Sequence, residues 1–205
     1  MNRIHLLSII YKMSNFSILQ QIVINRRSTK PAAFNGKSIP DTVIRQLLEL
    51  ANWAPSHGLT EPWRFIVYTG ESILRFCRQN AEQYRQTTDP DKFTPAKYEK
   101  QLHNGDSASH LILVYMERGS NPNITVQEEL CATAAAVENI LLGASALGIA
   151  VLWSTGGTVL HPSMKAWLGL RAEDIVLGLL YLGYTDDLPR PGKRSPIDNK
   201  TQWIS

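Results

Sequence analysis

The most constraining feature of this chain is an almost unbroken apolar run of seven residues, HLILVYM, at positions 110–116. The length of this run and its polar flanks are typical of a central β-strand that is covered on both faces. A second run, DIVLGLLYLGY at 174–184, has the same character. The two runs together predict a buried sheet that carries helices on its faces.

Helical spacing and further strand patterns surround these two runs. The stretch 126–148 has apolar residues at helical spacing together with many alanines, which predicts a long helix buried inside the domain or at a subunit interface. The elements follow one another without strict βαβ alternation, which favours an α+β fold. The remaining helices are expected at 15–25, from Pro40 to before Pro55, at 71–88 and at 161–168, and the remaining strands at 65–68 and 149–153.

Composition excludes several classes of protein. The 205 residues are 43% apolar and 19% charged, which is typical of one globular domain. A net charge of +3 is too small to indicate a nucleic-acid or anionic-membrane partner. Cys77 and Cys131 lie far apart without metal-type spacing, so we expect no disulfide framework and a reducing, cytoplasmic location.

The N-terminus contains only short apolar stretches. They fall below the roughly 20 residues that a membrane-spanning helix needs. Met13 offers a second plausible start, so we expect residues 1–13 to be an extension and residues 14–205 to form a single domain.

Three cations gather in the stretch INRRSTK at 24–30, where Arg26 and Arg27 precede Ser28 and Lys30. One interpretation is a solvated helix end, because cations there complement the helix dipole. The other is an anion site, because arginine forks and hydroxyl groups match phosphate oxygens. The residues alone leave both open.

Two weaker candidates lie later in the chain. Lys193 and Arg194 belong to a proline-rich tail that could fold back beside the first cluster. The stretch WSTGG at 153–157 follows a predicted strand, and its glycines could let backbone N–H groups face a ligand. The five histidines lack ligand spacing and no catalytic triad or phosphate loop is visible, so we expect neither a metal site nor a catalytic side chain.

Four motifs, in order and at these distances, make the chain resemble the nitroreductase family, and in particular its small members without large insertions. The motifs are INRRSTK, ANWAPSHGLTEPWRFIVYTG, AAAVENILLGASALGIAVLWSTGG and LGLRAEDIVLGLLYLGYTDD. The resemblance implies a three-layer sandwich, with a central, mostly antiparallel sheet flanked by helices. It also implies a C-terminal tail that extends to the partner subunit of a homodimer.

The resemblance further implies an FMN site at the subunit interface, at which bound FMN carries the chemistry. Arg26, Ser28 and Arg27 would hold its phosphate, Lys30 would lie near the pyrimidine edge, and Lys193 and Arg194 would complete the phosphate site. A backbone N–H of Thr155 or Gly156 would face flavin N5. The other residues implied at the cofactor are Trp53, Pro55, Ser56, His57, Trp153 and Ser154.

The implied function is an oxidoreductase that moves a hydride from NADH or NADPH through FMN to a nitroaromatic or quinone in a ping-pong cycle. Leu59 and Glu61 depart from the asparagine and glutamine of many members, which leaves a non-catalytic, dimeric flavin-binding protein as an alternative. A family variant that performs dehalogenation or enoate-type reduction is another, and the short polar segment 89–107 is the obvious candidate for its lid.

Overall fold

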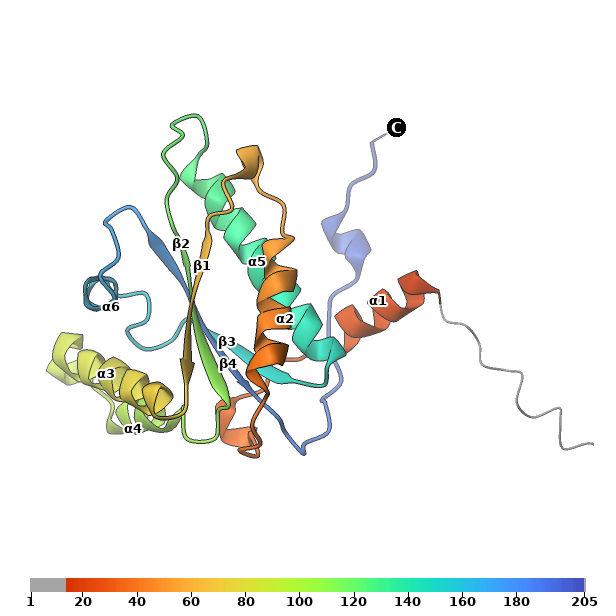
Figure 1. Ribbon diagram of the computed structural model, residues 1–205. Coiled ribbons are helices and arrows are strands. Elements are labelled where there is room, and N and C mark those ends of the chain that lie inside the picture. The colour runs from red at the N-terminus through yellow and green to blue at the C-terminus, as the bar shows by residue number, and fades with distance from the viewer. Residues whose placement is uncertain (1–13, 205) are drawn as a thin grey trace, which may run out of the picture.

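The computed structural model describes residues 14–204 and has an α+β architecture built on a four-stranded sheet (Figure 1). The strands follow the order β1-β2-β4-β3, and each neighbouring pair is antiparallel. This confirms the expected antiparallel sheet. The bounds are β1 Trp63–Thr69, β2 His110–Met116, β3 Ala150–Ser154 and β4 Ile175–Gly183.

The central strand β2 explains the apolar run from which it forms. Successive side chains of a strand point to opposite faces of its sheet. Leu111 and Leu113 accordingly pack into one core, whereas Ile112, Val114 and Met116 pack into the other. Helices cover both faces of the sheet, so the side chains on both faces of β2 are buried. The run is therefore apolar and does not alternate with polar residues.

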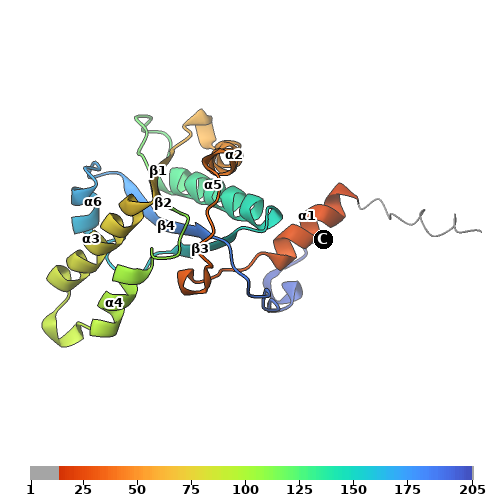
Figure 2. The same ribbon diagram turned by 60° about the horizontal axis from the view of Figure 1, so that its bottom comes forward.

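Helices form a layer on each side of the sheet, which confirms the three-layer sandwich (Figure 2). α2 (Asp41–Asn52) and α5 (Val126–Ala146) pack on the face that carries Ile112. α3 (Glu71–Thr87) and α6 (Pro162–Trp167) pack on the face that carries Leu111. Short 3-10 helices occur at η1 Pro31–Ala33, η2 His57–Leu59, η3 Pro90–Lys92 and η4 Ile197–Lys200.

The polar segment 89–107 contains a helix that the sequence analysis missed. α4 (Pro95–His103) packs against α3 and buries Gln101. Phe93, just before it, stacks on Tyr84 of α3 with ring centroids 5.5 Å apart. The segment is therefore packed on the domain by helical and aromatic contacts, and its role as a lid over a substrate remains a prediction.

The first helix has a different environment from the others. α1 (Asn15–Asn25) begins at Ser14, whose Oγ accepts the N–H of Ser17 at 3.1 Å. No residue of α1 is buried, and Phe16 is 71% exposed. Both views show α1 projecting from the layers near the C-terminal tail (Figures 1 and 2). The apolar face of α1 is thus not covered by any part of residues 14–204.

Residues 1–13 and Ser205 lie outside the described residues, so the N-terminal extension and the extent of the single domain remain predictions. Among the helices described, none combines the length and apolar character needed to cross a membrane.

Candidate functional site

The basic stretch after α1 lines a cavity of about 540 Å³ beside the C-terminal half of α5. Arg26, Arg27, Ser28 and Lys30 all contribute to its wall. Backbone pairing holds this stretch in place, since the N–H of Thr29 donates to the carbonyl of Val151 at 3.0 Å. The opposite walls come from Leu141, Ser145, Gly148, Ile149, Thr185, Asp187 and Arg190.

The charges around this cavity favour an anion. The side chain of Arg26 is only 21% exposed, and its Nε lies 4.0 Å from Oε1 of Glu138 on α5. Within residues 14–204, Lys30 has no acid at ion-pair distance. Arg26 is half-buried and its neighbour Glu138 stands at the limit of ion-pair distance, so a bound anion would stabilise the guanidinium further. Lys30 is exposed and adds positive charge at the same wall, and an arginine fork beside a hydroxyl suits phosphate.

Arg27 is directed differently from Arg26. Its Nε donates to the carbonyl of Arg190 at 2.8 Å, and its Nη1 donates to the carbonyls of Ile24 at 2.7 Å and Arg26 at 2.6 Å. The guanidinium is therefore occupied by backbone oxygens of two chain segments, although the residue lines the cavity.

The tail reaches the cavity through a residue that the sequence analysis did not select. Arg190 lines the cavity, whereas Lys193 and Arg194 do not. Both of the latter are exposed, and Arg194 Nη1 donates to the carbonyl of Lys193 at 2.8 Å. No short-range pattern distinguishes Arg190 from its basic neighbours, because its position depends on the contact with Arg27.

The stretch Trp153–Gly156 ends β3 and lies outside the lining of the basic cavity. Trp153 packs against β4, where its indole N–H donates to the carbonyl of Leu177 at 3.0 Å. Thr155 and Gly156 are exposed, and the N–H of Gly156 reaches Oγ of Ser154 at 3.4 Å. The backbone donors at this strand end are accessible to a ligand, and their contact with a flavin ring remains a prediction.

The loop after α2 contains the other expected site residues. Trp53 is 79% exposed, and Ser56 Oγ accepts the N–H of Glu61 at 3.3 Å. His57 Nδ1 lies 2.8 Å from Oε1 of Glu128 in the first turn of α5. Hydrogen bonds from the backbone N–H of Thr125, from His57 and from the Thr125 hydroxyl lower the pKa of Glu128 to about 2.

Two residues of this loop have backbone conformations that L-residues rarely adopt. Leu59 has φ 53° and Glu61 has φ 43°, and Leu59 is 83% exposed. Positive φ favours glycine or asparagine and is uncommon for leucine. Backbone strain of this kind concentrates at functional sites. The two positions at which this chain departs from the asparagine and glutamine of many family members are thus also the strained positions of the loop.

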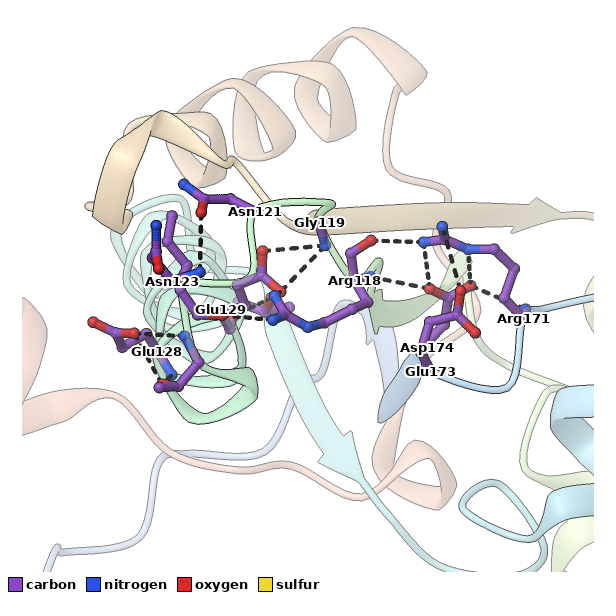
Figure 3. A network of polar contacts seen from close by, with 12 residues as sticks. Arg118, Gly119, Asn121, Asn123, Glu128, Glu129, Arg171, Glu173 and Asp174 are labelled. Atoms are coloured by element: carbon purple, nitrogen blue, oxygen red, sulfur yellow. Dashed lines mark hydrogen bonds and ion pairs between the residues drawn. The ribbon is translucent and has the colours of Figure 1, made fainter.

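A buried polar network supports the loop from below (Figure 3). Arg118 Nη1 lies 2.5 Å from Oε2 of Glu129, and its Nη2 donates to the carbonyl of Ile124 at 2.5 Å. Ile124 in turn packs under Gly58, where an added Cβ would lie 2.8 Å from its Cδ1. The network therefore holds Ile124 in place, and Ile124 packs against the loop segment that contains His57 and Leu59.

The same network continues to the turn before β4. Asp174 accepts the backbone N–H of Arg118 at 3.0 Å and a guanidinium N–H of Arg171 at 2.8 Å (Figure 3). Burial acts to raise the pKa of Asp174, but the hydrogen bonds from Arg171 and Arg118 outweigh it and hold the pKa below its ordinary value. The ionised Asp174 carboxylate thus connects the segment after β2, through Arg118, to the turn before β4, through Arg171.

The two groups of expected site residues do not meet within one chain. His57 contacts the first turn of α5, whereas the basic cavity is bordered by Leu141 and Ser145 near its other end. Residues 128 and 145 of a helix are about 25 Å apart along its axis. Figure 1 shows the loop with η2 near the upper end of α5 and the end of α1 near its lower end. The residues that follow α1 line the cavity.

One contact that the sequence analysis missed brings together a serine, a histidine and an aspartate. His110 Nε2 lies 3.0 Å from Oδ1 of Asp41, and its Nδ1 lies 2.9 Å from Oγ of Ser109. Ser109 Oγ also accepts the N–H of Ile39 at 2.7 Å, and His110 is only 3% exposed. None of these residues lines the basic cavity, and the contacts pin the start of β2 to the start of α2.

Comparisons with known proteins agree with this architecture. The nitroreductase family model matches residues 23–184. A Bacillus subtilis protein named "Putative NAD(P)H nitroreductase YfhC" is 27% identical over 184 residues, which are 90% of this chain and 93% of that protein. A solved structure of a nitroreductase-like family protein from Bacillus cereus has 27% identity and a TM-score of 0.77, covering 94% of this chain and 98% of its own.

A structure from Desulfovibrio desulfuricans in complex with FMN has 23% identity and a TM-score of 0.71, with coverage of 91% and 96%. The family match and the named relatives support an oxidoreductase with this three-layer fold. The chain belongs to the nitroreductase family, which confirms the resemblance found in its motifs.

Proposed function

We propose that this chain is an FMN-dependent NAD(P)H oxidoreductase that reduces an organic acceptor of the nitroaromatic or quinone type in a ping-pong cycle. The observation that carries the proposal is the cavity that Arg26, Ser28 and Lys30 line together. The name of the Bacillus subtilis relative gives NAD(P)H as the reductant, and the related Desulfovibrio structure was solved with FMN.

The residues present fit FMN at this cavity. The phosphate of FMN is a dianion, and Arg26 and Lys30 supply positive charge that nearby acids do not fully neutralise. Ser28 adds a hydroxyl donor on a segment that is fixed to β3 by its parallel bridge to Val151. A volume of about 540 Å³ falls within the usual range for a small-molecule or cofactor site.

FMN, when bound, supplies the hydride acceptor and donor, so the protein needs no side-chain acid or base for hydride transfer itself. A backbone N–H of Thr155 or Gly156 would polarise flavin N5, as a fixed dipole that needs no reorganisation. Lys30 would favour negative charge at the pyrimidine edge. Trp153 would hold this strand end in place through its bond to Leu177.

A homodimer with FMN at its interface is part of the proposal. It would bring the loop that contains Trp53, Pro55, Ser56 and His57 to the cavity of the other subunit. Within one subunit, the loop and the cavity lie at opposite ends of α5. It would also cover the apolar face of α1, where Phe16 is 71% exposed, and the end of the tail, where Trp203 is 90% exposed. Lys193 and Arg194 would then reach the phosphate from the tail.

A cytoplasmic location is also part of the proposal, and it is supported by the free thiols of Cys77 and Cys131, which suit a reducing compartment. The test is steady-state oxidation of NADH and of NADPH by FMN-loaded protein, with a nitroaromatic, a quinone and a dye as acceptors. Parallel lines in double-reciprocal plots for reductant against acceptor are expected from a ping-pong cycle. No turnover with any acceptor, despite bound FMN, would favour a non-catalytic flavin-binding protein instead. Leu59 and Glu61, which have positive φ, are the residues that support this alternative.

A further inference from the structure

Arg27 joins two segments that are far apart in the sequence. Its Nε donates to the carbonyl of Arg190, 163 residues away, at 2.8 Å. Its Nη1 donates to the carbonyls of Ile24 and Arg26, which close the C-terminal end of α1. The guanidinium is therefore a bridge between the end of α1 and the start of the tail.

The tail also covers the guanidinium with its backbone at Gly192. A Cβ added at this glycine would lie 2.6 Å from Cζ of Arg27, which is closer than real Cβ contacts. A glycine is thus needed for this close approach. Two independent observations, the hydrogen bond to Arg190 and the contact with Gly192, place the tail on Arg27.

The chemistry of the contact suits arginine and excludes lysine. The planar guanidinium offers its N–H donors in a fixed fork, whereas the lysine ammonium is a point donor on a flexible stem. Hydrogen bonds from a charged donor are roughly twice as strong as neutral ones. Three backbone carbonyls lie 2.8, 2.7 and 2.6 Å from the guanidinium nitrogens, and they direct this cation at backbone and not at a bound anion.

We infer that Arg27 is a positioning residue that clamps the tail, and that it is not itself a phosphate ligand. The clamp holds the segment 187–190, which forms one wall of the basic cavity. It also fixes the point from which Lys193 and Arg194 leave the domain. The consequence for FMN binding rests on the proposed function, but the clamp itself does not.

The test is limited trypsin digestion of FMN-free protein, in which mass spectrometry follows cleavage after Lys193 and Arg194. The expected result is that Arg27→Ala, Arg27→Lys and Gly192→Ala each speed this cleavage by about tenfold or more, because loss of a charge-assisted contact shifts the open population by at least that factor. Arg190→Ala retains the backbone carbonyl, so it should leave the cleavage rate near that of the unaltered chain.

The double variant Arg27→Ala/Gly192→Ala separates a clamp from two unrelated defects. If the two residues form one contact, the second substitution adds little to the first. Circular dichroism and the thermal midpoint check that each variant is folded, and Gly192→Ala retains every charge should Arg27→Ala prove unstable. Unchanged cleavage in Gly192→Ala, full rescue by Arg27→Lys, or multiplicative effects in the double variant would each overturn the clamp. Since no flavin is present, none of these results depends on whether FMN is the cofactor.

Discussion

Nε of Arg26 lies 4.0 Å from Oε1 of Glu138, across the space between the end of α1 and the exposed side of α5. The Glu138 side chain is 49% exposed, and ion pairs of this kind contribute little to stability because water screens them. The pair therefore keeps Arg26 close to the cavity without neutralising it. A phosphate dianion is a stronger partner for the same guanidinium.

Replacing Arg26 by alanine tests its assignment to the phosphate. Arg26→Ala should weaken FMN binding by about 1.5–3 kcal/mol, which is the usual contribution of a hydrogen bond to a charged group. Titration of flavin fluorescence into the flavin-free protein measures this change. Arg78→Ala, an exposed arginine on α3, is the matched control and should bind FMN normally. Equal affinities for Arg26→Ala and Arg78→Ala would remove Arg26 from the site.

Glu138 should oppose the anion that Arg26 binds. Glu138→Gln removes a negative charge near the phosphate, so we expect FMN to bind about two- to fivefold more tightly, consistent with the small energies of exposed pairs. The gain should shrink at high salt, because screening weakens the interaction of exposed charges. Glu99→Gln on α4, which packs on the other side of the sheet, should have no effect. Weaker binding by Glu138→Gln would mean that the carboxylate acts by orienting Arg26.

The low pKa of Glu128 predicts a pH-dependent contribution to stability. Its folded-state pKa of about 2 lies below the ordinary value of 4.5, so the contribution is present above pH 4.5 and is lost as the pH falls towards 2. Glu128→Gln should therefore have a lower thermal midpoint than the unaltered chain at neutral pH. The difference should close between these two pH values, as the carboxylate becomes protonated.

A matched measurement on Glu49→Gln, an exposed acid on α2, separates this effect from general charge effects. Its difference from the unaltered chain should stay nearly constant across the same pH range. A gap for Glu128→Gln that persists below pH 2 would show that the hydrogen bonds from Thr125 and His57 do not depend on the carboxylate charge.

The strained backbone at Leu59 predicts a stabilising substitution. Leu59→Asn should raise the free energy of unfolding by about 0.5–1 kcal/mol, because asparagine tolerates positive φ better than leucine. Little apolar burial is lost, since Leu59 is 83% exposed. Leu50→Asn, at a half-exposed helical position of α2, should have the opposite sign. Chemical denaturation measures both, and a loss of stability in Leu59→Asn would show that the leucine side chain has a partner.

The sequence was most informative where a pattern is local and repeated. The apolar run 110–116 predicted β2 and its burial, and the helix with capping residue Thr125 follows the expected spacing. The sequence does not predict α4, because the segment 89–107 is polar and contains Pro90 and Pro95. In the structure, Pro95 occupies the first helical position, where its fixed φ and absent N–H are tolerated.

The site was predictable only in part, for a physical reason. The cluster from Arg26 to Lys30 is contiguous, so its chemistry is visible in the sequence. The role of Arg190 is not, because it depends on a hydrogen bond to Arg27 across 163 residues. The indole of Trp153 likewise meets the carbonyl of Leu177 only after β3 and β4 have paired.

The measurement that tests the account most directly is the absorption spectrum of the purified protein, followed by mass spectrometry of the ligand released on heating. We predict the visible absorption bands of a flavin, and FMN as the released ligand. The same bands should be weak or missing in Arg26→Ala. An unaltered protein that carries no flavin, and binds none when FMN is added, would contradict the assignment of the basic cavity and leave Arg26 as an ordinary residue at the end of α1.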